Sequence, residues 1–554
     1  MRLAGRHADL LPGRQDYRGL RATWRGDLLA GITVAIVALP LALAFGVASG
    51  LGAQAGIATA IVAGIVAGVF GGSHLQVSGP TGAMTVVLVP VVASVGPDGV
   101  VVVALLSGLV LVAAGARRLG RYAGVLPWPV VEGFTAGIAL LIFLQQVPSA
   151  LGVARPEGEN TAAVAARAAA DWAGSGWSAA LVVAAVAATM VALPRLHRAL
   201  PASLIAVVLA TALAEAAGLD VARIGAIPSG IPAPSLPDVA ASDVPGLLSA
   251  VLAVAALAGI ESLLSAKVAD GMADGEPHDP DRELVGQGLA NVAVSFFGGM
   301  PATGAIARTA VNARAGARTR LATIVHGLAL ALIVVALAPL LERVPLAALA
   351  GVLMVTAVRM IEYGTVGRIL RSSRGDALLL TTTAAATVAF DLVIAVGVGV
   401  ALAGLLALRA LADSTTFRRE PVDVVDIDAA REHALLAEHI VTYRIDGALF
   451  FGAAQCFLLE LTEVTDVEVV ILRLGRLRLL DSTGAQALAD LIEHLEHRGI
   501  TVLLASVRPE HRRLLDRVGV LERLAHENHL LPSIDEALRH ARRHVRRAQP
   551  AVAA

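Results

Sequence analysis

The sequence is poor in cysteine and in charge. Its single cysteine, Cys456, excludes a disulfide framework and a cysteine-built metal site. Only 16% of the residues are charged, which is too few for the surface of a soluble chain of 554 residues. The net charge of −1 supplies no basic surface for nucleic acid. These shortages exclude a disulfide-rich secreted domain, a nucleic-acid-binding protein and an ordinary soluble globular protein.

Apolar residues fill the chain instead. They make up 56% of it, and the mean hydropathy is +0.72. Many apolar stretches reach about 17 to 22 residues, the length of a membrane-spanning helix, and they are too numerous for one cleaved signal peptide. We therefore expect an integral membrane protein with fourteen segments in two sets of seven, separated by the proline-rich residues 227–239. The expected segments are 28–46, 52–70, 80–94, 99–115, 127–147, 178–194 and 201–217, then 247–266, 284–298, 303–313, 321–341, 346–361, 376–391 and 393–411.

Basic residues test this number of segments, because Lys and Arg concentrate in cytoplasmic loops. With the N-terminus inside, the arginine clusters fall on the cytoplasmic side. The acidic loop 267–283 gives the rule no support. An even number of segments then places both termini in the cytoplasm. The clusters are Arg14/Arg18/Arg21/Arg25, Arg117/Arg118/Arg121, Arg195/Arg198, Arg314/Arg318/Arg320 and Arg368/Arg371/Arg374.

A soluble domain is expected after the last apolar segment, because charges become dense and apolar runs shorten. Strand patterns at 439–452, 467–474 and 500–507 alternate with helix patterns at 487–499 and 509–520, which predicts a small layered α/β domain. The basic stretch 539–547 is either a solvated helix end or a surface for anionic lipid. The expected domains are a cytoplasmic segment 1–26, a transmembrane domain 27–411 with repeats 27–217 and 247–411, the soluble domain 412–545 and a tail 546–554.

A small threonine-bearing turn occurs once in each half of the membrane domain, as SGPTGAM at 78–84 and PATGA at 301–305. Each is expected to bend at Gly and Pro, to begin a helix with Pro in its first turn, and to open an apolar run too short to cross a bilayer. Such a pair points to discontinuous helices of an inverted-repeat transporter, whose facing N-termini favour an anion. The alternative is that the small residues only permit tight helix packing. The candidate anion-binding residues are Ser78, Gly79, Thr81, Gly82, Ala83, Thr303, Gly304, Ala305 and Arg308.

Glu261 is an ionisable residue in the middle of the eighth segment, and such a residue is a functional candidate. It is expected either to bind Na⁺ together with Ser265 and carbonyl groups near Gly299, or to carry a proton. The structural alternatives are neutralisation by Arg308 and capping of a neighbouring helix. Arg308 itself either faces the anion or extends to the cytoplasmic interface. His326 is expected to be a packing or interfacial residue.

Over almost its whole length, the sequence resembles the SulP (SLC26) family of anion transporters with a C-terminal STAS domain. The amino-acid sequences of its first and eighth segments are most similar to those of the prokaryotic branch that includes bicarbonate and sulfate transporters. The resemblance is carried by the stretches 27–50, 70–84, 259–271 and 283–322, and by DSTG at 481–484.

The resemblance implies a seven-plus-seven inverted repeat divided into a core and a gate, with an anion held between the third and tenth helices. It also implies an elevator-like movement of the core and frequent homodimers. Leu41 departs from the family, which often has Gln there. Glu261 departs from the sodium-coupled bicarbonate branch, which usually has Asp, and this difference favours proton coupling.

In STAS domains similar to bacterial anti-sigma-factor antagonists, the DSTG loop can carry a phosphorylatable hydroxyl. The matching residue is Thr483, with Ser482 beside it, and a phosphate at a helix N-terminus is electrostatically acceptable. The alternative is that Asp481 merely caps the following helix. A cytoplasmic partner of the domain is expected in the regulatory case.

The predicted function is secondary active import of a small inorganic oxyanion, bicarbonate or sulfate, coupled to H⁺ or Na⁺ across a bacterial cytoplasmic membrane. Dicarboxylate transport, an uncoupled exchanger or channel, and a membrane-anchored signalling protein are the alternatives. An enzyme is not expected, because the sequence shows no metal-ligand cluster and no nucleophile with a base. No cofactor is expected apart from Na⁺ as a coupling ion.

Overall fold

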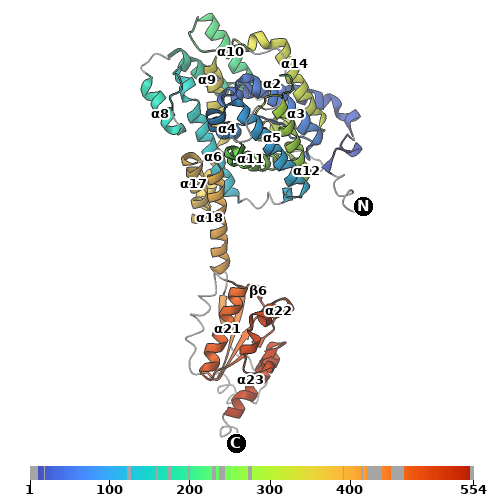
Figure 1. Ribbon diagram of the computed structural model, residues 1–554, viewed down its shortest axis with the longest axis vertical. Coiled ribbons are helices and arrows are strands. Elements are labelled where there is room, and N and C mark those ends of the chain that lie inside the picture. The colour runs from blue at the N-terminus through green and yellow to red at the C-terminus, as the bar shows by residue number, and fades with distance from the viewer. Residues whose placement is uncertain are drawn as a thin grey trace. The chain divides into compact units, whose positions relative to one another are not determined.

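The fold was obtained as a computed structural model of the full chain (Figure 1). It describes residues 10–17, 19–121, 127–157, 160–172, 177–197, 200–226, 232–235, 244–272, 277–390, 392–413, 416–420, 439–450 and 467–548. The described residues form two compact units, Met1–Val400 and Ala401–Ala554. Cys456, most of the proline-rich segment 227–239 and the end of the predicted tail lie outside them.

The first unit is helical, and each of the fourteen predicted segments corresponds to one helix. Long apolar runs explain these helices, and the described residues contain eight helices long and apolar enough to cross a membrane. The first set is α2 (Leu20–Ala48), α3 (Ala53–Phe70), α4 (Gly82–Val95), α5 (Pro97–Ala116), α6 (Trp128–Gln145), α9 (Trp177–Leu196) and α10 (Ala202–Ala216). The second set is α11 (Val244–Asp270), α12 (Pro280–Phe296), α13 (Ile306–Arg314), α14 (Leu321–Leu341), α15 (Leu346–Met360), α17 (Arg374–Ala389) and α18 (Leu392–Asp413).

Three short helices interrupt loops that the sequence analysis left without structure. They are α7 (Val147–Leu151), α8 (Thr161–Asp171) and α16 (Tyr363–Ser372). Helix α8 is capped by Asn160, whose side chain accepts a hydrogen bond from the backbone N–H of Ala163. These helices are too short to span a membrane, and the sequence contains no long apolar run that would have predicted them.

Packing in the two sets repeats the same pattern. Helix α5 packs on α12 as α14 packs on α3, and α2 packs on α14 as α11 packs on α5. Similarly, α6 packs on α17 as α15 packs on α9. If the helices of each set are numbered from one to seven, exchanging the two sets converts each of these packed pairs into the other. For example, helix four of the first set packs on helix two of the second set, and helix four of the second set packs on helix two of the first. The first four helices of both sets therefore form one group and the last three another, as expected for an inverted repeat.

Glycine allows the closest of these contacts. A methyl group at Gly108 of α5 would lie 2.7 Å from the carbonyl oxygen of Gly288, and one at Gly288 of α12 would lie 2.6 Å from the carbonyl oxygen of Gly108. Either distance is shorter than real carbon–oxygen contacts, so a larger residue would separate the helices. Small residues at helix interfaces are the usual means of close packing in a bilayer.

The second unit is an α/β domain with helices on both faces of a sheet. The strand order is β3 (Thr416–Glu420), β4 (Ile440–Leu449), β5 (Val469–Arg473), β7 (Thr501–Ala505) and β8 (Leu530–Leu531), with β6 (Leu477–Leu480) also paired to β4. Among the described strands, only β3 runs antiparallel to its neighbour. The predicted strands and helices are confirmed, whereas the short strands β3, β6 and β8 were missed.

Of the helices that the structure describes in this unit, three cover the sheet. Apolar side chains of α21 (Ser482–His497) and α22 (Pro509–Val518) pack on one face. Helix α23 (Ile534–Ala548) packs on the other through Ala537, Ala541 and Val545, against Ile471 and Leu503 among others. The basic stretch 539–547 therefore belongs to a docked helix, and that helix continues to Ala548, beyond the predicted boundary at 545.

Candidate functional site

The two threonine-bearing turns lie side by side, as predicted. Residues Ser78–Gly79 (β1) pair antiparallel with Thr303–Gly304 (β2), with Ser78 opposite Gly304 and Gly79 opposite Thr303. All four residues are buried. The backbone N–H of Ala305 also donates to the carbonyl oxygen of Val77, 2.9 Å away. One small sheet thus joins the two halves of the membrane unit.

A short helix starts directly after each of these strands. Thr81 is the N-cap of α4 and Ala305 is the N-cap of α13, and neither side chain caps the first turn. The backbone N–H groups at both N-termini are therefore without a side-chain acceptor, and each terminus carries roughly half a positive charge. With 14 and 9 residues, the helices rise about 21 and 14 Å, less than the roughly 30 Å of a bilayer core.

The expected role of proline in these turns is wrong. Pro80 precedes the N-cap Thr81, and Pro301 lies four residues before the N-cap Ala305. Neither proline occupies the first helical turn. Because the β1–β2 pairing holds the residues just before each helix in an extended conformation, the helices begin later than the sequence pattern indicated.

Glu261 links the two turns through its carboxylate. Its Oε2 atom accepts hydrogen bonds from the hydroxyl groups of Thr303, at 2.7 Å, and Thr81, at 3.1 Å. The glutamate side chain is half-buried, whereas both threonines are buried. Thr81 precedes α4, and Thr303 lies three residues before α13. The carboxylate therefore lies where the two positive helix ends meet.

Arg308 lies at the same junction. Its side chain is 2% exposed, and its Nη2 atom donates to the carbonyl oxygen of Pro80 at 2.7 Å. Among the described residues, Nη1 has no hydrogen-bond partner, and Arg308 forms no ion pair with Glu261. Arg308 thus faces the paired turns instead of reaching the interface, and its charge attracts that of Glu261 without a contact ion pair.

The other two residues proposed to bind Na⁺ form hydrogen bonds with residues other than Glu261. Ser265 shares a hydrogen bond with the hydroxyl of Thr309, at 3.1 Å. The backbone N–H of Gly299 donates to the carbonyl oxygen of Val294, and a methyl group at Gly299 would meet Val294 and Thr59. In the part of the chain that the structure describes, no hydrogen bond joins either residue to Glu261.

His326 is fully buried in α14, in agreement with a packing role. Neither of its ring nitrogens has a hydrogen-bond partner among the described residues. The ring lies against α3, because a methyl group at Gly64 would approach it to 3.3 Å. Leu41, which replaces the glutamine common in the family, packs at the edge of the main apolar core.

A polar face of α12 supports the turns, and the sequence analysis missed it. The amide of Asn291 bonds both backbone groups of Ala302, at 2.7 and 3.0 Å, and that of Gln287 donates to the hydroxyl of Ser78. Glu283 accepts from the amide of Gln76 at 2.7 Å and from Gln287 at 3.2 Å. Their spacing of four residues on an apolar helix is the signal that would have identified them.

Other hydroxyl groups complete this support. Ser262, next to Glu261, accepts from the backbone N–H of Gly304 at 3.0 Å, and Thr309 accepts from that of Val77 at 3.0 Å. Thr59 of α3 bonds both backbone groups of Met300. Buried backbone groups near the junction thus have defined partners, which holds the two helix ends in place.

In the α/β unit, Asp481 is the N-cap of α21. Its carboxylate accepts from the backbone N–H of Gly484 at 2.7 Å. Ser482 and Thr483 follow it and are exposed. The capping interpretation is therefore confirmed, and phosphorylation of Thr483 stays a prediction.

The paired helix ends suit an anion. They offer backbone N–H groups and a buried guanidinium, and the two threonine hydroxyls beside them donate to Glu261. Donors of this kind bind carboxylate, carbonate and sulfate alike. Glu261 adds a group that can take up a proton at the same place.

Comparison with known proteins agrees with this geometry. Residues 24–383 match the sulfate permease family, and residues 434–537 match the STAS domain. The chain is 33% identical to the "Putative sulfate transporter YvdB" of Bacillus subtilis, over 92% of this chain and 96% of that protein. It is 31% identical to the bicarbonate transporter BicA of Synechocystis, over 93% of this chain and 94% of that protein.

A solved structure has the same fold. The murine anion transporter Slc26a9, in an inward-facing state, aligns with a TM-score of 0.81 and 18% identity, over 94% of this chain and 91% of that one. The relatives' names denote transporters and not enzymes. The chain therefore belongs to the sulfate permease (SulP/SLC26) family of anion transporters, as a multi-pass membrane protein with a C-terminal STAS domain.

Proposed function

We propose that this protein is a secondary active importer of a small inorganic oxyanion, bicarbonate or sulfate, driven by a proton gradient. The observation that carries the proposal is the hydrogen bonding of Glu261 to both Thr81 and Thr303, at the point where the two half-helices meet. The names of the relatives, a sulfate and a bicarbonate transporter, support the same class of substrate.

The positive helix ends account for anion binding. Each end favours a negative charge by about 0.3 to 2 kcal/mol. Arg308 adds a full charge, and its Nη1 atom, without a partner in the described residues, is available to an oxyanion. In the low-dielectric bundle such an attraction is much stronger than in water. An inorganic oxyanion has no apolar groups, so these hydrogen-bond donors and positive charges are sufficient to bind it.

Proton coupling follows from electrostatics. An ionised Glu261 occupies the same positive site that the anion needs, and two negative charges a few ångströms apart repel each other strongly in a low-dielectric medium. Anion binding therefore favours protonation of the carboxylate, so that proton and anion move together. Sodium coupling is the alternative, with Glu261, Ser265 and carbonyl groups near Gly299 as the ligands.

An elevator-type movement is also part of the proposal. The binding residues belong to the group made of the first four helices of each set, and this group contacts the remaining helices chiefly through α2 with α15 and α10, and α4 with α6. Sliding along these contacts would carry the intact site across the membrane. We further propose a homodimer in a bacterial cytoplasmic membrane, with both termini inside.

Transport by proteoliposomes tests the coupling. Uptake of labelled bicarbonate, sulfate and fumarate is measured under imposed pH or Na⁺ gradients for the wild type and Glu261→Gln. We expect uptake of one inorganic anion that follows the pH gradient in the wild type and loses this dependence in the variant. Glu215→Gln is the matched control, since that side chain is 41% exposed and pairs with Arg223.

Each alternative function predicts a different result in this uptake experiment. Preferential uptake of fumarate would make the protein a dicarboxylate transporter, and dependence on Na⁺ alone would overturn proton coupling. If uptake ignores both gradients and Glu261→Gln behaves like the wild type, the protein is an uncoupled exchanger or channel.

A further inference from the structure

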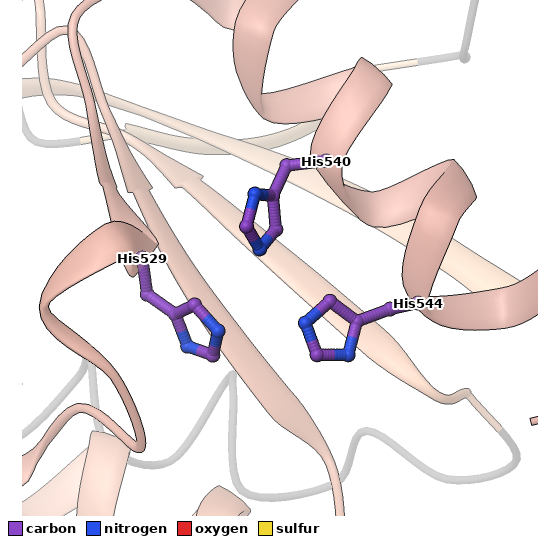
Figure 2. Close-up of side chains that lie close together, drawn as sticks. All are labelled: His529, His540 and His544. Atoms are coloured by element: carbon purple, nitrogen blue, oxygen red, sulfur yellow. The ribbon is translucent and has the colours of Figure 1, made fainter. Parts of the chain in front are cut away.

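Three histidines of the α/β unit lie together on the face that α23 covers. His529 ends the short 3₁₀ helix Glu527–His529, directly before β8. His540 and His544 lie on α23, four residues apart and therefore on the same side of the helix. Figure 2 shows the three imidazole rings turned toward a common space between the two elements.

The ring geometry is close to that of a metal site. The centroid of His529 lies 5.4 Å from that of His540 and 5.3 Å from that of His544, and the latter two are 5.2 Å apart. One nitrogen from each ring lies within 4.8 Å of the others. Nitrogens bound tetrahedrally at 2.0 to 2.1 Å from zinc are about 3.4 Å apart, so modest side-chain rotation would bring these together.

His529 is a buried ligand without a protein partner. It is 1% exposed, and neither ring nitrogen has a hydrogen-bond partner in the described residues. A buried polar group in this situation costs free energy unless something satisfies it.

Packing alone does not explain the cluster. The apolar contacts between α23 and the sheet are made by Ala537, Ala541 and Val545, on the adjoining face of the helix. Three neighbouring imidazoles also repel one another when they take up protons. The sequence analysis found no metal-ligand cluster, because His529 is separated from the other two by a strand and a turn and only the fold brings it to them.

We propose that His529, His540 and His544 bind one divalent transition-metal ion, of the zinc, cobalt, nickel or copper class, in the STAS domain. Three imidazoles with an open fourth position are a known arrangement for such ions. His526, exposed and 5.5 Å from His529 between ring centroids, is the nearest further imidazole. The bound ion would tie α23 to the turn before β8.

In the metal-free protein, Arg543 occupies a position that disfavours metal binding. Its Nη2 atom lies 3.4 Å from Nδ1 of His540, and arginine can only donate in this contact. Nδ1 then holds the lone pair, and the metal must either displace Arg543 from Nδ1 or change the tautomer of His540. The arginine charge also repels a cation. Removing Arg543 should therefore strengthen metal binding.

Metal binding is tested on the full-length protein, purified in detergent without a polyhistidine tag and stripped with a chelator. Cobalt(II) is titrated and followed by its visible d–d absorption, and bound zinc is measured by elemental analysis after dialysis. We expect one ion per chain for the wild type and its loss in His540→Gln/His544→Gln. The matched control is His494→Gln/His497→Gln, which removes two exposed histidines of α21 and should keep the ion.

Two further measurements separate a site from adventitious binding. Zinc should raise the melting temperature of the wild type and not that of His540→Gln/His544→Gln, whose metal-free melting temperature should equal that of the metal-free wild type. Arg543→Gln should bind cobalt several-fold more tightly. An absent absorption, equal metal content in the two double variants, or an affinity that does not rise in Arg543→Gln would overturn the proposal.

Discussion

At the scale of single residues, the site depends on the buried side chain of Arg308. The space for its guanidinium exists because residue 79 is a glycine. A methyl group at Gly79 would lie 2.6 Å from Nη1 of Arg308. A charged group inside a bilayer costs about 2.5 to 3.5 kcal/mol on insertion scales, and the carbonyl oxygen of Pro80 offsets part of this cost. The position of the guanidinium is therefore fixed by Gly79 and Pro80 together.

Gly79→Ala should displace Arg308 without unfolding the bundle. Hydrogen bonds to charged groups contribute about 1.5 to 3 kcal/mol, so we expect the KM for the anion to rise roughly tenfold or more. Uptake kinetics in proteoliposomes measure this. Gly364→Ala is the control, because a methyl group there meets nothing within 4 Å. An unchanged KM in Gly79→Ala would contradict a role of Arg308 in anion binding.

At the scale of elements, two strands of two residues each hold the half-helices, and α12 holds the strands. Such short strands have little stability of their own. The polar face of α12 supplies what they lack: Gln287 donates to Ser78, and Asn291 bonds both backbone groups of Ala302. Helix α12 is therefore a support for the site, although none of its side chains is proposed to touch the anion.

Asn291→Leu should destabilise this support. The change keeps a branched side chain but leaves the buried N–H and C=O of Ala302 without their partner, at about 1 to 3 kcal/mol for each group. The loss should exceed that in Asn160→Ala, which removes an exposed N-cap worth about 1 kcal/mol. Thermal unfolding in detergent compares them. A smaller decrease in melting temperature for Asn291→Leu than for Asn160→Ala would show that α12 does not stabilise the turns.

At the scale of the whole molecule, the repeated packing of the two sets places equivalent helices in equivalent contacts. An inverted repeat requires the sets to have opposite orientations in the membrane, which an odd number of segments per set provides. Seven segments in each set satisfy this condition, and together they return the chain to the side where it started.

This orientation is testable because the chain has a single cysteine. In a Cys456→Ser background, Glu157→Cys should react with a membrane-impermeant thiol reagent in intact cells. Arg371→Cys should react only after permeabilisation, since its loop is predicted to be cytoplasmic. Both side chains are exposed, so burial does not limit the reaction. The opposite labelling would invert the proposed topology.

The sequence by itself determined the features that depend on local chemistry. Apolar runs long enough for a bilayer set the membrane segments, and Gly and Pro next to Thr81 and Thr303 marked the broken helices. Glu261 was evident as an isolated charge in an apolar helix. The short helix α8, the strand β8 and the starts of the half-helices were missed or misplaced, because short elements depend on their neighbours more than on their own pattern.

The tertiary structure alone decided that Glu261 meets both turns. Thr81 and Glu261 are 180 positions apart, and Thr303 and Glu261 are 42 apart, yet hydrogen bonds join them. The direction of Arg308 and the hydrogen-bond partner of Ser265 were likewise open in the sequence. His529 joins His540 and His544 only through the docking of α23. The physical reason is that hydrogen bonds and ion sites act over a few ångströms, so partners distant in the chain become partners only when packing brings their atoms together.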